Sequence, residues 1–199
     1  MDASPQAIKH ILKKYHSTLD KRGDLPAFSR IKIYKKIENF SKPATSGYYL
    51  RAKLELSCAL KVLGNWEYCE LKNGSARELL ARAEEFLHGE GEIKKLEKTK
   101  NYFSTQAENL IAKGKEYFVA AYAGFACISA VNSVLYDINF DTLSIPEIES
   151  DPDDWTACFY ASISYCGGAT WEEGVGDDLK RREFWEWFLN DAVPALWQM

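Results

Sequence analysis

The sequence has few of the residues on which metal and redox chemistry usually depend. Its 199 residues include three histidines and five cysteines, and no two cysteines are spaced as CxxC. An odd number of cysteines without metal-ligand spacing argues against both a disulfide framework and a zinc site. The N-terminal residues show no basic start followed by an unbroken apolar run, which a secretion signal would have. We therefore expect reduced cysteines and a cytoplasmic protein.

Proline and glycine are also scarce, at 6 and 12 residues, whereas aromatic residues make up 14% of the chain. A low-complexity chain would have more proline and glycine, and a disordered chain would have far fewer aromatic residues. A chain of this length can bury one sizeable hydrophobic core. These features predict a folded, globular protein.

The hydrophobic pattern is helical almost throughout. No segment alternates apolar and polar residues over the length of a strand, and apolar residues instead recur three or four positions apart. We predict an all-α protein, a single compact bundle of about seven or eight helices. One domain covers residues 1–199, with a basic helical pair (1–46) before a helical core (47–199) whose C-terminal third is acidic.

Several residues are suited to begin these helices. Ser75 and Glu78 have the spacing of a capping box, in which each side chain bonds to the other residue's backbone N–H. Asp153 or Asp154 is a suitable N-cap for a helix through Cys166, and Asp177 or Asp178 for the last helix.

The segment from Tyr117 to Tyr136 contains no charged residue and is about as long as the roughly 20 residues that cross a membrane. Small and polar residues dilute its hydrophobicity, its aromatic residues are not gathered at the two ends, and no second span accompanies it. We predict that it forms a central core helix, whose small residues let neighbouring helices approach closely, and that the protein does not bind membranes.

Charge is distributed unevenly along the chain. The first 45 residues hold ten basic and four acidic residues, a net charge of +6, and the rest of the chain carries −10. No lysine or arginine occurs between Tyr136 and Lys180, although eleven acidic residues do. A field of this sign repels nucleic acid and attracts basic partners. The N-terminal lysines lie opposite an apolar stripe without interleaved aromatic residues, so we expect no nucleic-acid binding there either.

Patterns typical of catalysis are weak. Glu85 and His88 match the Glu-x-x-His pattern of helical di-iron sites, but the chain has no second such pair. Asp151, Asp153 and Asp154 could attract a divalent cation, yet the glycine and the distant glutamate of an EF-hand are missing. We predict no catalytic residues, no metal and no cofactor. A metal-dependent helical-bundle enzyme that uses Glu85 and His88 is the alternative.

Two tryptophans of the acidic third stand beside carboxylates. Protein interfaces often have aromatic anchors at their centre, and complementary charge accelerates encounter. This combination predicts a surface that recognises a basic protein, and the competing interpretation is that both tryptophans belong to the core. The candidate binding residues are Asp151, Asp153, Asp154, Trp155, Trp171, Glu172, Glu173, Asp177 and Asp178.

The segments DPDDWTACFYASISYCGGATWEE and RREFWEWFLNDAVPALW resemble the C-terminal part of immunity protein family five of bacterial polymorphic toxin systems. AYAGFACISAVNSVLYD and LRAKLELSCALKVLGNWE are similar in style to that family, so the resemblance covers Leu50 to Trp197. It implies an all-α cytoplasmic protein, not an enzyme, that binds and neutralises a cognate toxin domain, such as a basic nuclease or another nucleic-acid-modifying enzyme. No catalytic or contact residue carries over. A helical interaction module with another purpose is the further alternative.

Overall fold

The computed structural model describes residues 5–40, 44–69, 74–138, 149 and 151–197. In these residues all regular secondary structure is helical, which confirms the predicted class. Eight α-helices have ten or more residues: α1 (Pro5–His16), α2 (Ala27–Phe40), α3 (Ala44–Cys69), α4 (Ser75–Leu87), α5 (Ile93–Ile111), α6 (Phe118–Tyr136), α7 (Ala157–Cys166) and α8 (Asp178–Trp187). Shorter segments are the 3₁₀ turns η1 (Lys115–Tyr117) and η3 (Pro152–Asp154), the π-helical η4 (Phe188–Ala192) and α9 (Val193–Ala195).

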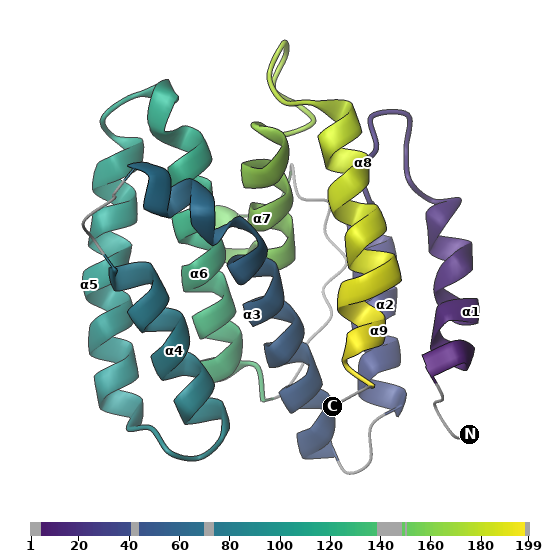
Figure 1. Cartoon of the computed structure of the whole chain (residues 1–199), viewed down its shortest axis with the longest axis horizontal. Coiled ribbons are helices and arrows are strands. Elements are labelled where there is room, and N and C mark those ends of the chain that lie inside the picture. Colours follow the sequence, from purple (N-terminus) through teal and green to yellow (C-terminus); the bar gives the residue numbers. More distant parts are fainter. Residues whose placement is uncertain (1–4, 41–43, 70–73, 139–148, 150, 198–199) are drawn as a thin grey trace.

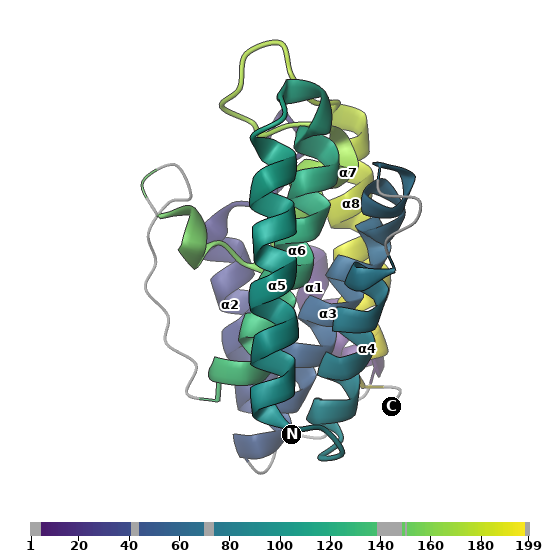
Figure 2. The ribbon, with the colours of Figure 1, turned by 90° about the vertical axis from the view of Figure 1, so that its left-hand side faces the viewer.

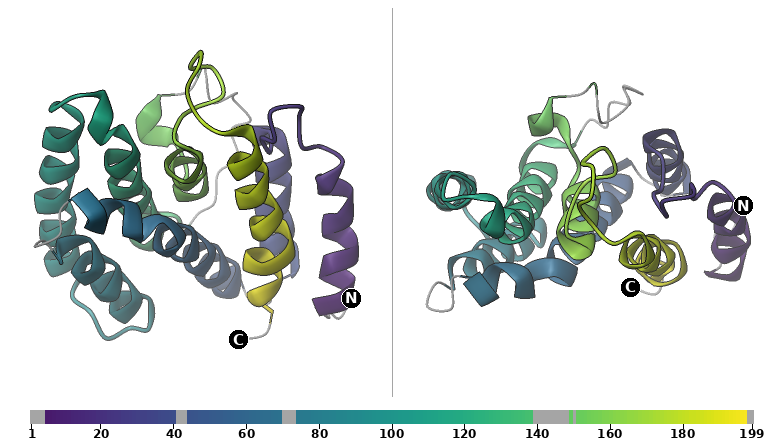
Figure 3. Two further views of the ribbon diagram at one scale, coloured as in Figure 1. Left: turned by 45° about the horizontal axis from the view of Figure 1, so that its top comes forward. Right: turned by 90° about the horizontal axis from the view of Figure 1, so that it is seen from above.

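The helices form a bundle around α3 and α6, which share the most extensive contact in the molecule. Most helices run along one common direction, with α5 at one side and α1 at the other (Figure 1). α4 and α5 pack against α6 on one side, and α7 packs against both α3 and α6. α8 lies beyond α7, and α1 contacts the end of the chain through η4 and α9. The side view and the view from above show that η3 projects from the face of the bundle behind α7 (Figures 2 and 3).

The uncharged segment predicted to be a core helix is α6. Together with η1 it is long and apolar enough to cross a membrane, but half of its most apolar stretch is buried inside the bundle. Its small residues lie where the neighbouring helices come closest. A Cβ atom on Gly124 would lie 2.9 Å from the Trp66 ring of α3 and 3.1 Å from Cβ of Ala107 on α5. Glycine at this position therefore sets the distance between three helices.

Buried polar side chains connect the helices across the core. Arg51 of α3 is 1% exposed. Its guanidinium contacts the Glu38 carboxylate of α2, and its Nε lies 3.1 Å from Oδ2 of Asp137 at the end of α6. Asn132 of α6 accepts a 3.0 Å hydrogen bond from Nζ of Lys100 on α5. The side chains of Arg51 and Asn132 are thus paired with groups from other helices, whereas the Tyr15 hydroxyl and the Trp66 indole N–H are buried without a hydrogen-bond partner among the described residues.

The structure corrects two of the predicted helix starts. Gly74 is the N-cap of α4, Ser75 donates its hydroxyl to Gln106, and Glu78 pairs with Arg82, so the capping box does not form. Asp153 and Asp154 lie in the turn η3, and the N-cap of α7 is Thr156. Sequence spacing identifies residues able to cap a helix, but the direction of the preceding chain decides which residue does so.

Asp177 caps α8 as expected. Its Oδ1 accepts the backbone N–H groups of Leu179 and Lys180 at 2.9 and 3.1 Å. The carboxylate therefore satisfies two N–H groups that the first turn of a helix leaves without a partner.

The contact at Gly124 leads to a stability prediction with an internal control. Replacing Gly124 with alanine should lower the free energy of unfolding by about 1–3 kcal/mol, because the new methyl group overlaps the Trp66 ring. A Cβ on Gly64, which is exposed on α3, would meet no atom within 4 Å. Gly64→Ala should therefore stabilise the protein by about 0.5–1 kcal/mol, since alanine loses less backbone entropy in a helix. Urea unfolding followed by circular dichroism measures both, and equal effects would contradict the packing argument.

Candidate functional site

The structure brings the two candidate tryptophans into direct contact. Trp155 lies two residues before α7 and Trp171 lies in the loop that follows this helix, yet their ring centroids are 5.6 Å apart in an edge-on arrangement. Both rings also contact Phe159 of α7, at 5.1 and 5.8 Å. Trp171 is 39% exposed and Trp155 is partly buried, so neither is a fully enclosed core residue. Trp155, Phe159 and Trp171 are called the aromatic platform below.

Further aromatic residues, which the sequence did not indicate, extend this platform along α6. The Tyr160 ring lies 5.3 Å from Trp155, 5.6 Å from Phe125 and 6.4 Å from Tyr122. Tyr122 and Phe125 are partly exposed and three positions apart, so they share one face of α6. This spacing was a usable signal, but it was hidden in a segment that is apolar on every side.

Hydrogen bonds hold the chain that carries Trp155. The Ser129 hydroxyl of α6 donates to the carbonyl of Trp155 at 2.7 Å, and the Tyr160 hydroxyl donates to the carbonyl of Pro152 at 2.6 Å. The turn η3 is thereby attached to both α6 and α7. The side of the platform nearest to the N-terminus of α7 is fixed by the helices behind it.

Arg181 of α8 fixes the loop that carries Trp171. This side chain is 2% exposed, and its guanidinium donates to the carbonyls of Gly168 and Arg22 at 3.0 and 3.1 Å. It also forms a 2.5 Å contact with the Asp178 carboxylate. Gly167 ends α7 with a φ of +87°, a conformation that favours glycine. Because one buried arginine joins the loop to α8 and to the loop before α2, the position of Trp171 depends on three segments that are distant in the sequence.

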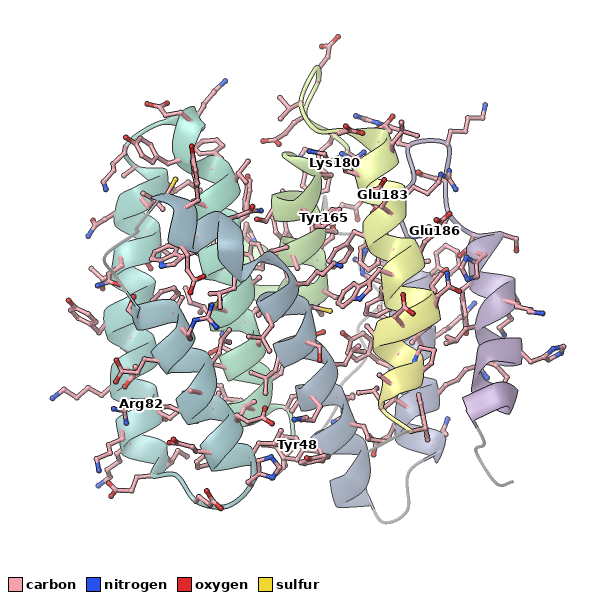
Figure 4. All side chains as sticks on the ribbon, viewed as in Figure 1. Tyr48, Arg82, Tyr165, Lys180, Glu183 and Glu186 are labelled. Carbon is pink, nitrogen blue, oxygen red and sulfur yellow. The ribbon has the colours of Figure 1, made fainter. Side chains whose placement is uncertain are left out.

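The candidate carboxylates divide into two groups. Asp177 caps α8. Asp178 pairs with Arg181, and its Oδ1 lies 3.7 Å from Nε of Arg22. Oε2 of Glu172 accepts the Ala169 N–H at 2.9 Å. These three have structural partners within the chain. Asp151, Asp154 and Glu173 are exposed, and the side chain of Asp153 lies outside the described residues. The exposed side of α8 carries both positive and negative charges, from Lys180, Glu183 and Glu186 (Figure 4). The purely acidic segment therefore ends where α8 begins.

A buried carboxyl group from α3 completes the N-terminus of α7. Glu55 is 1% exposed, and its Oε2 accepts the backbone N–H of Ala157 at 2.5 Å. Its Oε1 accepts the hydroxyl of Tyr34 on α2. A residue remote in sequence therefore provides the cap that was expected from the adjacent aspartates, and it holds α7 against α2 and α3.

The surroundings of Glu55 change its acidity. Burial raises the pKa of this carboxyl group to about 8, although the N–H groups of Ala157 and Cys158 and the charge of Arg30 oppose the shift. Burial likewise raises the pKa of Cys158 and of Cys58 well above the ordinary thiol range. Neither cysteine therefore forms a thiolate nucleophile readily.

The residues of the metal-enzyme alternative are not assembled into a site. Nε2 of His88 lies 3.3 Å from Oε1 of Glu84, and Glu84 also contacts Lys53. Glu85, the glutamate of the Glu-x-x-His pattern, is instead exposed. In the described ranges, no three side chains of His, Cys, Asp or Glu are grouped so that they could hold a metal ion.

The comparisons with known proteins agree with the resemblance seen in the sequence. Residues 9–195 match the family model described as Immunity protein Imm5. No curated protein matches the chain. The family match covers almost the whole chain, including α2 and the part of α1 from residue 9 onward, which the resemblance did not reach.

The buried Glu55 predicts an unusual dependence of stability on pH. Its pKa is higher in the folded protein than in the unfolded chain, so the folded state binds the proton more tightly. Its contribution to the free energy of unfolding is therefore largest below about pH 4.5 and declines up to about pH 8, by at most about 1.4 kcal/mol per pH unit. Glu55→Gln, which keeps the cap but does not titrate, should flatten the decline between pH 5.5 and 8. Chemical unfolding across this range measures the slope.

A matched control uses an exposed glutamate. Glu90→Gln in the loop after α4 removes an exposed carboxylate without changing the core, and the slope of this variant should equal that of the parent protein. If Glu55→Gln also left the slope unchanged, the assignment of this pH dependence to Glu55 would be wrong.

Proposed function

Because the chain belongs to the Imm5 family of immunity proteins, which implies neutralisation of a cognate toxin, we propose that it binds the toxin through the aromatic platform and the exposed carboxylates beside it. The observation that carries this proposal is the contact between Trp155 and Trp171 on the outside of α7. The 43 residues between Tyr136 and Lys180, which include both tryptophans, contain no basic residue. Partly exposed aromatic side chains in such a field suit a basic protein partner.

The proposed mechanism is occlusion. Asp154 and Glu173 are exposed beside the two tryptophans and supply long-range attraction for a basic surface. The tryptophans then supply the buried contact, since aromatic anchors at the centre of an interface contribute most of its energy. A toxin that acts on nucleic acid has a basic substrate site, and covering that site would block its activity without any catalytic step by the immunity protein.

The platform is formed before binding. Ser129, Tyr160 and Arg181 hold its two supporting segments by hydrogen bonds to backbone carbonyls. Little conformational freedom is then lost when the toxin docks, which favours tight association. The five free cysteines suit a reducing compartment, and we place the encounter in the cytoplasm.

The first test is capture of the toxin from the native host with the purified chain as bait. Low salt, about 0.1 M, should retain one basic toxin-like domain encoded beside this chain, and about 1 M salt should release it, because the screening length falls from about 10 Å to about 3 Å. Mass spectrometry identifies the captured protein. Failure to retain such a domain at low salt would contradict the proposed function.

The second test places charge reversal on the proposed surface. Asp154→Lys with Glu173→Lys should weaken toxin binding by at least about tenfold, mostly through a slower association rate. Neither carboxylate caps a helix or pairs with a basic side chain in the described ranges. Surface plasmon resonance at two salt concentrations separates the two rates.

The control carries the same change in net charge at the opposite end of the molecule. This control is Glu85→Lys with Glu90→Lys. Glu85 is exposed on the last turn of α4 and Glu90 in the loop that follows it, and this end of α4 lies at the opposite end of the bundle from the loop after α7 (Figure 1). Equal losses for the two double variants would mean that total charge, and not this surface, governs binding.

A further inference from the structure

The aromatic platform already binds one guanidinium group on its inner side. Arg30 of α2 is 5% exposed, and its Cζ lies 4.8 Å from the ring centroid of Phe159 and 5.3 Å from that of Trp185. Its Nη1 donates to the carbonyl of Leu25 at 2.7 Å. The chain thus shows how this cluster binds arginine: the planar group lies against aromatic faces while its N–H groups meet oxygen acceptors.

The outer side of the platform has the same two components. Trp171 is 39% exposed, and in the described part of the chain no lysine or arginine lies over its ring. The adjacent Glu172 is partly exposed and uses Oε2 to accept the Ala169 N–H, which leaves Oε1 without a hydrogen bond among the described residues. Burial and the negative charge of Glu172 raise the pKa of Tyr122.

Other exposed aromatic residues are arranged differently. Phe28 has Nζ of Lys32 at 5.2 Å from its ring centroid, and Tyr136 has Nζ of Lys100 at 4.9 Å. These rings already have a cation from this chain. Trp171 instead lies in the segment that contains no basic residue, so a cation over its exposed face would have to come from another molecule.

We propose that Trp171 and Glu172 form a subsite for one arginine side chain of the partner protein. The guanidinium would lie against the exposed indole face and direct an N–H group to Oε1 of Glu172. Arginine is favoured over lysine because its planar group stacks on aromatic rings and is less strongly hydrated than an ammonium group. The inference rests on the proposed function, because it assigns to the toxin the residue that this surface recognises.

The test uses small probes on the intact chain and needs no toxin. Argininamide and lysinamide are titrated at equal salt while the indole N–H signal of Trp171 is followed by NMR. We expect saturable shifts with argininamide and an affinity at least about threefold higher than for lysinamide, in line with an exposed cation–π contact. Equal affinity for the two probes, or no saturable shift, would overturn the proposal.

Two variants test the residues separately. Glu172→Gln keeps an acceptor for the Ala169 N–H and should lower the argininamide affinity at least about threefold, because it removes the charge. Trp171→Leu should abolish the preference for argininamide over lysinamide. In this variant, binding is followed through the indole signals of the other tryptophans and the backbone amide shifts near Glu172. A spectrum otherwise like that of the parent protein verifies the fold. Unchanged affinity in Glu172→Gln would contradict the role of the carboxylate.

The outcome is separable from that of the proposed function. If the bait captures a toxin at low salt but binds argininamide no better than lysinamide, the arginine subsite is wrong and the immunity function stands. If the probes bind as expected but no toxin is captured, the subsite exists and its assignment to a toxin is wrong.

Discussion

The buried carboxyl group of Glu55 is the constraint on which the proposed recognition surface depends. It lies where α2, α3 and α7 meet, accepts the first free N–H of α7 and receives the hydroxyl of Tyr34. A helix start without such a partner would leave N–H groups unsatisfied inside the protein, at a cost of about 1–3 kcal/mol for each buried group. With it, α7 begins at a fixed point, and Trp155 and Phe159 are positioned on either side of that point.

The opposite side of the platform relies on a buried arginine in a comparable way. Arg181 donates to one carbonyl of the loop between α7 and α8 and to one of the loop between α1 and α2, and Arg30 lies beneath Phe159. Basic side chains are therefore buried behind the surface, whereas exposed carboxylates stand on it. The acidic segment between Tyr136 and Lys180 can therefore pack against the basic N-terminal helices. The electrostatic potential at its exposed surface stays negative.

Much of the fold follows from local patterns, and the candidate site follows from them only in part. The 3.6-residue period of the apolar positions determines which segments are helical, and the small residues of α6 indicate a central helix. The pairing of Trp155 with Trp171 could not be derived, because they are separated by the whole of α7 and meet only through the path of the following loop. The contact of Asp178 with Arg22 was hidden for the same reason, whereas the contacts of Asp178 with Arg181 and of Glu172 with Ala169 are local.

By itself the sequence determined an all-α protein, an acidic segment without basic residues, and a resemblance to an immunity family that the comparison confirms. These properties are local or compositional, so they require no knowledge of which segments touch. The tertiary structure alone placed Arg22, from the loop before α2, 3.7 Å from Asp178, whereas the cap by Asp177 is local and was predicted from the sequence. It also decided that Glu55 and not Asp153 or Asp154 caps α7, because a backbone N–H bonds to the nearest acceptor in space, whatever its distance along the chain.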